Sequence, residues 1–135
     1  MIAKLIVSLL VFSCFANEQK PDQLYGHWKV IGVTGASPVT AMNGTAAARL
    51  IGRPLILTAP KVLFMREKCK PNYAVSKLSS AEFVQDYRVE LKTLNLPDPV
   101  TRFDAGCMDI FVAASGKIIF TWKGYFLEAK KTFAK

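Results

Sequence analysis

The chain has 135 residues, the length of a single domain, and 51% of them are hydrophobic. Its 18 basic and 10 acidic residues give a net charge of +8, which favours anionic partners, but no basic stripe interleaved with aromatic residues indicates nucleic-acid binding. Once Cys14 is removed or acylated during export, two cysteines and one histidine remain, too few ligands for a structural zinc site. We therefore expect neither a metal nor another cofactor.

Residues 1–16 have the pattern of an export signal. A lysine precedes an apolar run at residues 5–12, and small side chains then occupy Cys14 and Ala16, the two positions that a signal peptidase inspects. The run is shorter than the roughly 20 residues that span a bilayer. We expect cleavage after Ala16 and a periplasmic or secreted protein. In the alternative interpretation Cys14 is lipidated, as in bacterial lipoproteins, and anchors the protein to a membrane.

A polar, flexible lead-in is expected at residues 17–24, followed by a single globular domain at residues 25–135. The first half of this domain is typical of three strands, at residues 28–33, 54–58 and 61–66. Apolar residues dominate the first strand, where Trp28 and Val30 share one face. Between the first two strands, Thr45 is expected to cap a short helix that runs to Leu50.

Residues 79–94 are predicted to form the one substantial helix. Ser79 and Glu82 have the spacing of a capping box. The apolar residues fall on one stripe at spacings of four, four and three: Phe83, Tyr87, Leu91 and Leu94. The charged residues four apart carry like charges, so packing of the stripe against a sheet must stabilise this helix.

The remainder of the chain is predicted to be β. Four more strands are expected, at residues 100–104, 110–113, 117–123 and 125–129, with a short turn at Ser115-Gly116. The total is about seven strands and one helix. This pattern predicts an α+β domain in which a strongly curved antiparallel sheet packs against, or partly closes around, the helix of residues 79–94.

Cys69 and Cys107 remain after export, because either route of processing removes Cys14 from the free thiols. Two cysteines in an exported chain are most simply one disulfide. The loop closed by this bridge spans about 38 residues, for which loop-closure entropy gives about 4 kcal/mol. Removal of residues 1–16 leaves 17 basic and 10 acidic residues. The expected partners are lipid headgroups, cell-wall polymers or acidic proteins.

Gly26-His27-Trp28 resembles the G-x-W motif of lipocalins and related calycin barrels. In those families the tryptophan closes the barrel floor and a basic residue near the C-terminus packs on its face, an arrangement that cation–π attraction explains. The resemblance implies a small lipocalin-like β-barrel in which Lys130 or Lys131 covers Trp28. The order of strand, mid-chain cysteine, helix and C-terminal strands also resembles META-type periplasmic domains. Lipocalins carry their helix after the barrel, whereas this one is expected mid-chain.

The titratable residues form no recognisable catalytic set. His27 is the only histidine, and the acidic candidates for glycoside hydrolysis, Asp98, Asp104 and Asp109, lie near turns or the predicted disulfide. No nucleophile elbow, phosphate-cradling loop or zinc-protease motif is present. We expect a protein that is not an enzyme. A hydrolase that uses Asp104 or Asp109 is the weakest alternative.

The aromatic side chains are more numerous than a small core strictly needs, and most of them are expected to form the core. If some line a cavity, they hold an apolar ligand. If some lie at an edge among Lys61, Arg66, Lys68 and Lys70, they anchor a partner protein. The candidates for contact with a ligand or partner are Trp28, Phe64, Tyr87, Phe120, Trp122 and Lys130. We expect an exported, non-catalytic binding protein that acts on another envelope or secreted macromolecule, of the inhibitor, immunity or accessory type. The alternative is a lipocalin-like carrier of a small hydrophobic ligand.

Overall fold

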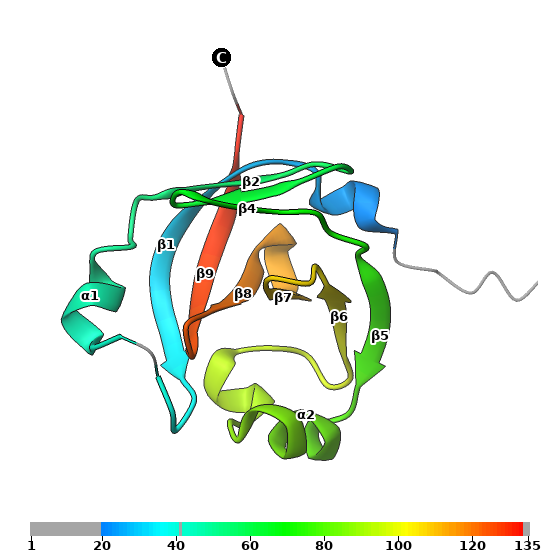
Figure 1. Ribbon diagram of the computed structural model, residues 1–135. Helices are drawn as coiled ribbons and strands as arrows, with labels where there is room; N and C mark the ends of the chain where they lie inside the picture. The colour runs from blue at the N-terminus through cyan, green and yellow to red at the C-terminus, as the bar shows by residue number, and fades with distance from the viewer. Residues whose placement is uncertain (1–19, 41, 134–135) are drawn as a thin grey trace, which may run out of the picture.

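A computed structural model describes residues 20–40 and 42–133. The export signal predicted at residues 1–16, with Cys14, lies outside the described residues. The described part forms an antiparallel sheet of nine strands, which curls into a half-barrel (Figure 1). One helix of eight residues, one of five and three 3-10 turns complete it.

The elements have the following bounds. The strands are β1 (Gly26–Ala36), β2 (Pro54–Leu57), β3 (Val62–Phe64), β4 (Glu67–Cys69), β5 (Ala74–Leu78), β6 (Val100–Asp104), β7 (Asp109–Val112), β8 (Ile118–Trp122) and β9 (Tyr125–Thr132). The α-helices are α1 (Gly44–Ala48) and α2 (Ser80–Tyr87), and the 3-10 turns are η1 (Pro21–Leu24), η2 (Leu91–Leu94) and η3 (Ala114–Gly116).

The strands follow one another around the sheet almost in chain order. The order is β4-β3-β2-β1-β9-β8-β7-β6-β5, so the first and last strands pair with each other and the sheet is open between β4 and β5. A disulfide joins Cys69, at the end of β4, to Cys107 in the β6–β7 connection, and confirms the predicted bridge. The disulfide therefore links the β4 edge of the sheet to its opposite half.

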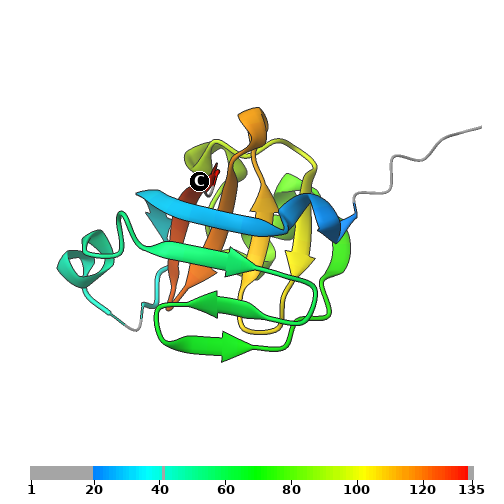
Figure 2. The same ribbon diagram turned by 90° about the horizontal axis from the view of Figure 1, so that it is seen from above.

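The two halves of the curled sheet form two layers around the main core. Figure 2 shows β2, β3 and β4 lying across β6 to β9 at a steep angle. The long strand β1 reaches both layers, because its pairing with β9 shifts between Val30 and Gly32 and again between Val33 and Gly35. The core between the layers includes Trp28, Val30 and other residues that alternate inward from both halves.

A second, smaller core lies on the other face of the layer formed by β6 to β9. Phe111, Ile119 and Phe126 alternate away from the main core and pack against Phe83 of α2 and Leu94 of η2. Figure 1 shows α2 below this layer, opposite β2 and β4. The sheet therefore packs against the helix, and the helix lies outside the half-barrel.

Two strands more than the predicted seven are present, β4 and β5. Both lie at edges of the sheet. Glu67 and Lys68 of β4 are exposed, and of the five residues of β5 only Leu78 is buried. An edge strand with so little buried surface has a weak hydrophobic pattern in its sequence, so β4 and β5 were not predicted. The predicted strand at residues 61–66 ends at Phe64, where the chain turns into β4.

The predicted helix of residues 79–94 is wrong in its length. The capping box of Ser79 and Glu82 is present, but α2 ends at Tyr87 because Arg88 adopts a left-handed conformation, with φ 60°. After a bend at residues 88–89 and the extended residue Glu90, the chain forms η2, which returns Leu91 and Leu94 to the same core as Phe83. The apolar stripe thus continues across a break in the helix, so its periodicity gave no sign of the end.

The structure also corrects two smaller predictions for segments near the first strand. Asn43, not Thr45, caps the short helix α1 by accepting a hydrogen bond from the amide of Ala46, and α1 ends at Ala48. Part of the expected lead-in forms η1, in which Leu24 is buried. Leu24 thereby fixes the entry of the chain into the sheet.

Candidate functional site

Trp28 lies in the main core, and its polar and cationic contacts are local. Its indole N–H donates to the carbonyl of Leu24 at 2.8 Å. The ammonium of Lys131 lies 5.6 Å from the ring centroid, in the geometry of a cation–π contact. A Cβ on Gly26 would lie 2.9 Å from Cε of Lys131, so the glycine leaves room for this cation. Lys131, paired opposite Trp28, is the lysine that covers the indole, and Lys130 lies exposed opposite Lys29.

Three predicted ligand-binding aromatics pack against one another inside the half-barrel. The ring centroid of Phe64 lies 5.0 Å from that of Phe120 and 4.8 Å from that of Trp122, both edge-on. All three side chains are buried. Edge-to-face contacts at these distances fill the space between the two layers. The structure brings these residues together as core.

Tyr87 belongs to the second core and to a polar cluster beside it. Its hydroxyl donates to Asp109 at 2.6 Å and accepts from Arg102 at 3.1 Å, and Arg102 also contacts Asp86 and Ser76. Burial of the phenol, with the Asp109 hydrogen bond, raises the pKa of Tyr87 above its usual range. The proton therefore stays on the hydroxyl, and the cluster fixes α2 to β6 and β7.

The acidic residues proposed for hydrolysis act in local structure. Asp104 accepts from the amide of Gly106, Asp98 accepts from the amide of Ser80, and Asp109 accepts from Tyr87. The Asp104 carboxylate lies in a turn, that of Asp98 at the start of α2 and that of Asp109 on β7, and no hydrogen bond joins two of them in the described residues. Nor do any three His, Cys, Asp or Glu side chains converge within residues 20–40 and 42–133 as a metal site would require.

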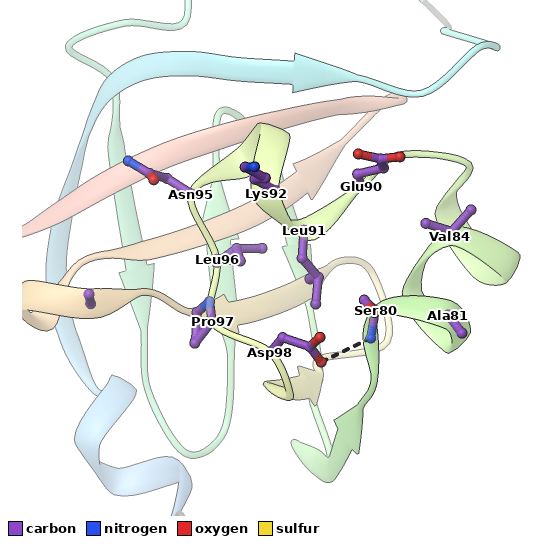
Figure 3. Close-up of a pocket in the computed structure, with 11 residues that line it drawn as sticks. Ser80, Ala81, Val84, Glu90, Leu91, Lys92, Asn95, Leu96, Pro97 and Asp98 are labelled. Carbon is purple, nitrogen blue, oxygen red and sulfur yellow. Dashed lines mark hydrogen bonds between the residues drawn. The ribbon is translucent and has the colours of Figure 1, made fainter.

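A broad groove lies between α2, η2 and the segment at residues 95–98, and it is the candidate site. Its volume is about 860 Å³. Figure 3 shows its lining: Ser80, Ala81 and Val84 from α2, and Glu90, Leu91, Lys92, Asn95, Leu96, Pro97 and Asp98 from the segment that follows, together with Ala114. Leu91 and Leu96 are buried, whereas Val84 is 38% exposed. The groove therefore offers an apolar floor with a solvent-facing valine on one wall.

The break in the helix creates this groove. Arg88 and Asn95 both have φ 60°, and each reverses the direction of the chain after a helical turn. The turn at Asn95 directs Leu96 back under the groove, where its amide donates to the carbonyl of Leu91. Asp98 then accepts from Ser80 at the start of α2 and closes one end (Figure 3). A continuous helix over residues 79–94 would leave no such space.

The charged groups of the groove are unequally distributed. Glu90 and Asp98 lie on either side of Leu91 in Figure 3, and Lys92 is the one cation among the described lining residues. Such a rim favours a ligand that carries an apolar group beside a positively charged or hydrogen-bond-donating group.

Sequence reasoning missed this groove. It assigned Leu91 to a helical stripe and gave no binding role to Val84 or Pro97. The available signal was the cluster of two prolines and an asparagine at residues 95–99, which marks a loop after a short helix. That cluster indicates a turn, but the position of the turn relative to α2 depends on packing far along the chain.

Comparison of the chain with protein-family models, with curated proteins and with solved structures finds no match. None of the helices in the described part of the chain has the length and hydropathy needed to cross a bilayer.

Proposed function

We propose that the chain is an exported, non-catalytic binding protein that engages another envelope or secreted protein, as an inhibitor, immunity or accessory factor. The observation that carries the proposal is the groove between α2 and η2. Its floor of Leu91 and Leu96 and its volume of about 860 Å³ suit a short segment of a partner protein. The carboxylates of Glu90 and Asp98 favour a segment in which an apolar anchor stands next to a lysine or arginine.

Export is supported by two independent features. The disulfide between Cys69 and Cys107 belongs to proteins of oxidising compartments. The pattern of residues 1–16 is typical of an export signal, with cleavage after Ala16 or lipidation of Cys14. We therefore expect the partner to lie in the periplasm or outside the cell.

Substitutions on the exposed wall of the groove test the proposal. Ala81→Arg fills the groove with a long cation, and Val84→Glu adds a charge to its apolar wall. Because Ala81 and Val84 are both exposed, α2 should fold in these variants as in the wild type. A photo-reactive residue at Val84 should cross-link one defined partner in periplasm or culture fluid. The Ala81→Arg change should abolish that product.

The matched control uses the same helix. Gln85 is exposed and does not line the groove, so a photo-reactive residue there should give no such product. Equal yields of cross-linked product from positions 84 and 85, or a product that persists in the Ala81→Arg variant, would show that the partner does not bind in the groove.

A lipocalin-like carrier of a small hydrophobic ligand is the second candidate, and one arrangement favours it. Gly26, Trp28 and Lys131 stand in the relation that the lipocalin resemblance implies. Against it, Phe64 and Phe120 contact each other where a ligand would lie. Native mass spectrometry of the exported protein separates the two candidates. A co-purifying apolar molecule supports the carrier, whereas a ligand-free protein that binds no fluorescent fatty-acid probe rejects it.

A further inference from the structure

Two hairpin tips meet on the side of the molecule that carries α1. The first is Met65-Arg66, between the paired residues Phe64 and Glu67. The second is Lys123-Gly124, between Trp122 and Tyr125. Figures 1 and 2 show α1 and the β8–β9 turn on one side of the molecule and β5 on the other. Met65, Arg66 and Lys123 line a common hollow of about 270 Å³ between the tips.

Both tips use residues that their backbone conformation disfavours. Met65 has φ 59° and Lys123 has φ 49°, in the left-handed region where glycine and asparagine are preferred. Each such residue adds strain that an asparagine would relieve, and strain of this kind concentrates at functional positions. Methionine and lysine therefore occupy the two tips at a cost to stability, and their side chains are what the tips present to solvent.

Exposed apolar side chains gather around these tips. Six large hydrophobic residues are substantially exposed in the described part of the chain, and three of them belong to this side: Val39 (83%), Ile51 (50%) and Met65 (44%). The backbone of Val39 packs on the β8–β9 turn, since a Cβ on Gly124 would lie 2.5 Å from its carbonyl oxygen. Ile51 follows Leu50, which lines the hollow together with Met65.

Cations surround the apolar side chains. Arg53 and Arg66 line a second hollow of about 300 Å³ with Met65, and the ammonium of Lys123 lies 5.8 Å from the centroid of the Trp122 ring. Glu67 is the one acid among the described lining residues of the two hollows. The ion pairs formed among residues 20–40 and 42–133 are Arg102–Asp86 and Lys117–Glu128, and neither involves one of these three cations.

We propose that this side of the molecule, formed by the β3–β4 tip, the β8–β9 tip and the turn after α1, binds the surface of an anionic lipid membrane. Met65 and Ile51 enter the acyl boundary, while Arg53, Arg66 and Lys123 contact headgroup phosphates. The residues come from separate turns and form no long channel, so they fit a broad surface better than an extended acidic peptide. This surface is separate from the groove between α2 and η2.

The expected strength follows from the side chains. Each lysine or arginine near an anionic surface contributes about 1 kcal/mol, which is about a fivefold change in affinity. A methionine that buries its exposed half contributes a similar amount. Three cations and two apolar side chains therefore give weak, reversible attachment that increased salt weakens.

The sharpest test replaces the two strained residues by asparagine. In the Met65→Asn/Lys123→Asn variant the protein should be about as stable as the wild type, because asparagine suits both left-handed positions and this gain offsets the lost contact of Lys123 with Trp122. Affinity for vesicles of phosphatidylcholine and phosphatidylglycerol should fall about 25-fold, about fivefold for each side chain. Co-sedimentation of the exported protein with vesicles measures affinity, and thermal unfolding measures stability.

The control variant removes one exposed apolar side chain and one cation from the opposite side. Val75 and Lys77 are both exposed on β5, so Val75→Thr/Lys77→Gln should bind vesicles like the wild type. Three results overturn the proposal: equal binding to pure phosphatidylcholine vesicles, an undiminished affinity of the asparagine variant, or binding to polyglutamate without binding to phosphatidylglycerol. The last result assigns the surface to acidic proteins instead.

Discussion

Loss of the disulfide should be the most damaging small change to this fold. Cys69 ends the edge strand β4, which pairs with β3 alone among the described strands, and Cys107 lies in the connection between β6 and β7. Between β4 and β5 the sheet is open, so the bridge attaches the β4 edge covalently to the other layer. Without the bridge, β4 is attached through its pairing with β3 and through the chain alone.

The magnitude follows from the loop that the bridge closes. The two cysteines are 38 residues apart. The loss of loop-closure entropy for a loop of that length is worth about 4 kcal/mol. At roughly 4 °C per kcal/mol for a domain of this size, the melting temperature should fall by about 15 °C.

Urea titration of the Cys69→Ala/Cys107→Ala variant, followed by tryptophan fluorescence, measures this loss. The same shift should follow when the wild type is treated with reductant, and the reductant should leave the variant unchanged. Hydrogen exchange should increase most in β4, because the rest of the sheet keeps its ladder of paired strands. Equal urea midpoints for wild type, reduced wild type and variant would refute this reasoning.

Two further changes test the environment of single side chains. Lys131→Met removes the cation over Trp28 and should lower the free energy of unfolding by about 0.5–1 kcal/mol, whereas Lys130→Met should change it little; urea titration compares them. Stability should also fall with increasing alkalinity. Burial raises the pKa of Tyr73 to about 12 and that of Tyr87 higher still, so both phenols keep their protons in the folded state above about pH 10, where the unfolded chain releases them. The decline should be smaller in the phenylalanine variants of either tyrosine, and an unchanged slope would contradict the assigned burial.

Much of the sheet was predictable because its inner strands carry strong alternation. Val62 and Phe64 of β3 face the main core, and so do Ile118, Phe120 and Trp122 of β8, within the strands predicted at residues 61–66 and 117–123. The edge strands β4 and β5 were not predictable, because an edge strand buries few side chains and its residues have no reason to alternate. The disulfide was predictable from the export signal together with the two cysteines that remain after it.

The site was far less predictable than the fold. The groove depends on the end of α2 at Arg88, and an arginine in a left-handed conformation has no strong sequence signal. The apolar stripe instead predicted a continuous helix, because η2 returns Leu91 to the core at nearly helical spacing. Three of the aromatic residues named as binding candidates, Phe64, Phe120 and Trp122, are buried in the main core. An abundance of aromatic side chains indicates a core before it indicates a cavity.

The most direct test of the account is a hydrogen-exchange footprint of the protein bound to the partner that the cross-linker at Val84 captures. Protection should appear in α2, in η2 and at residues 95–98, while exchange in the strands that enclose Phe64 and Phe120 stays as in the free protein. Protection confined to those strands would contradict the account, since it would place the binding site inside the half-barrel rather than in the groove.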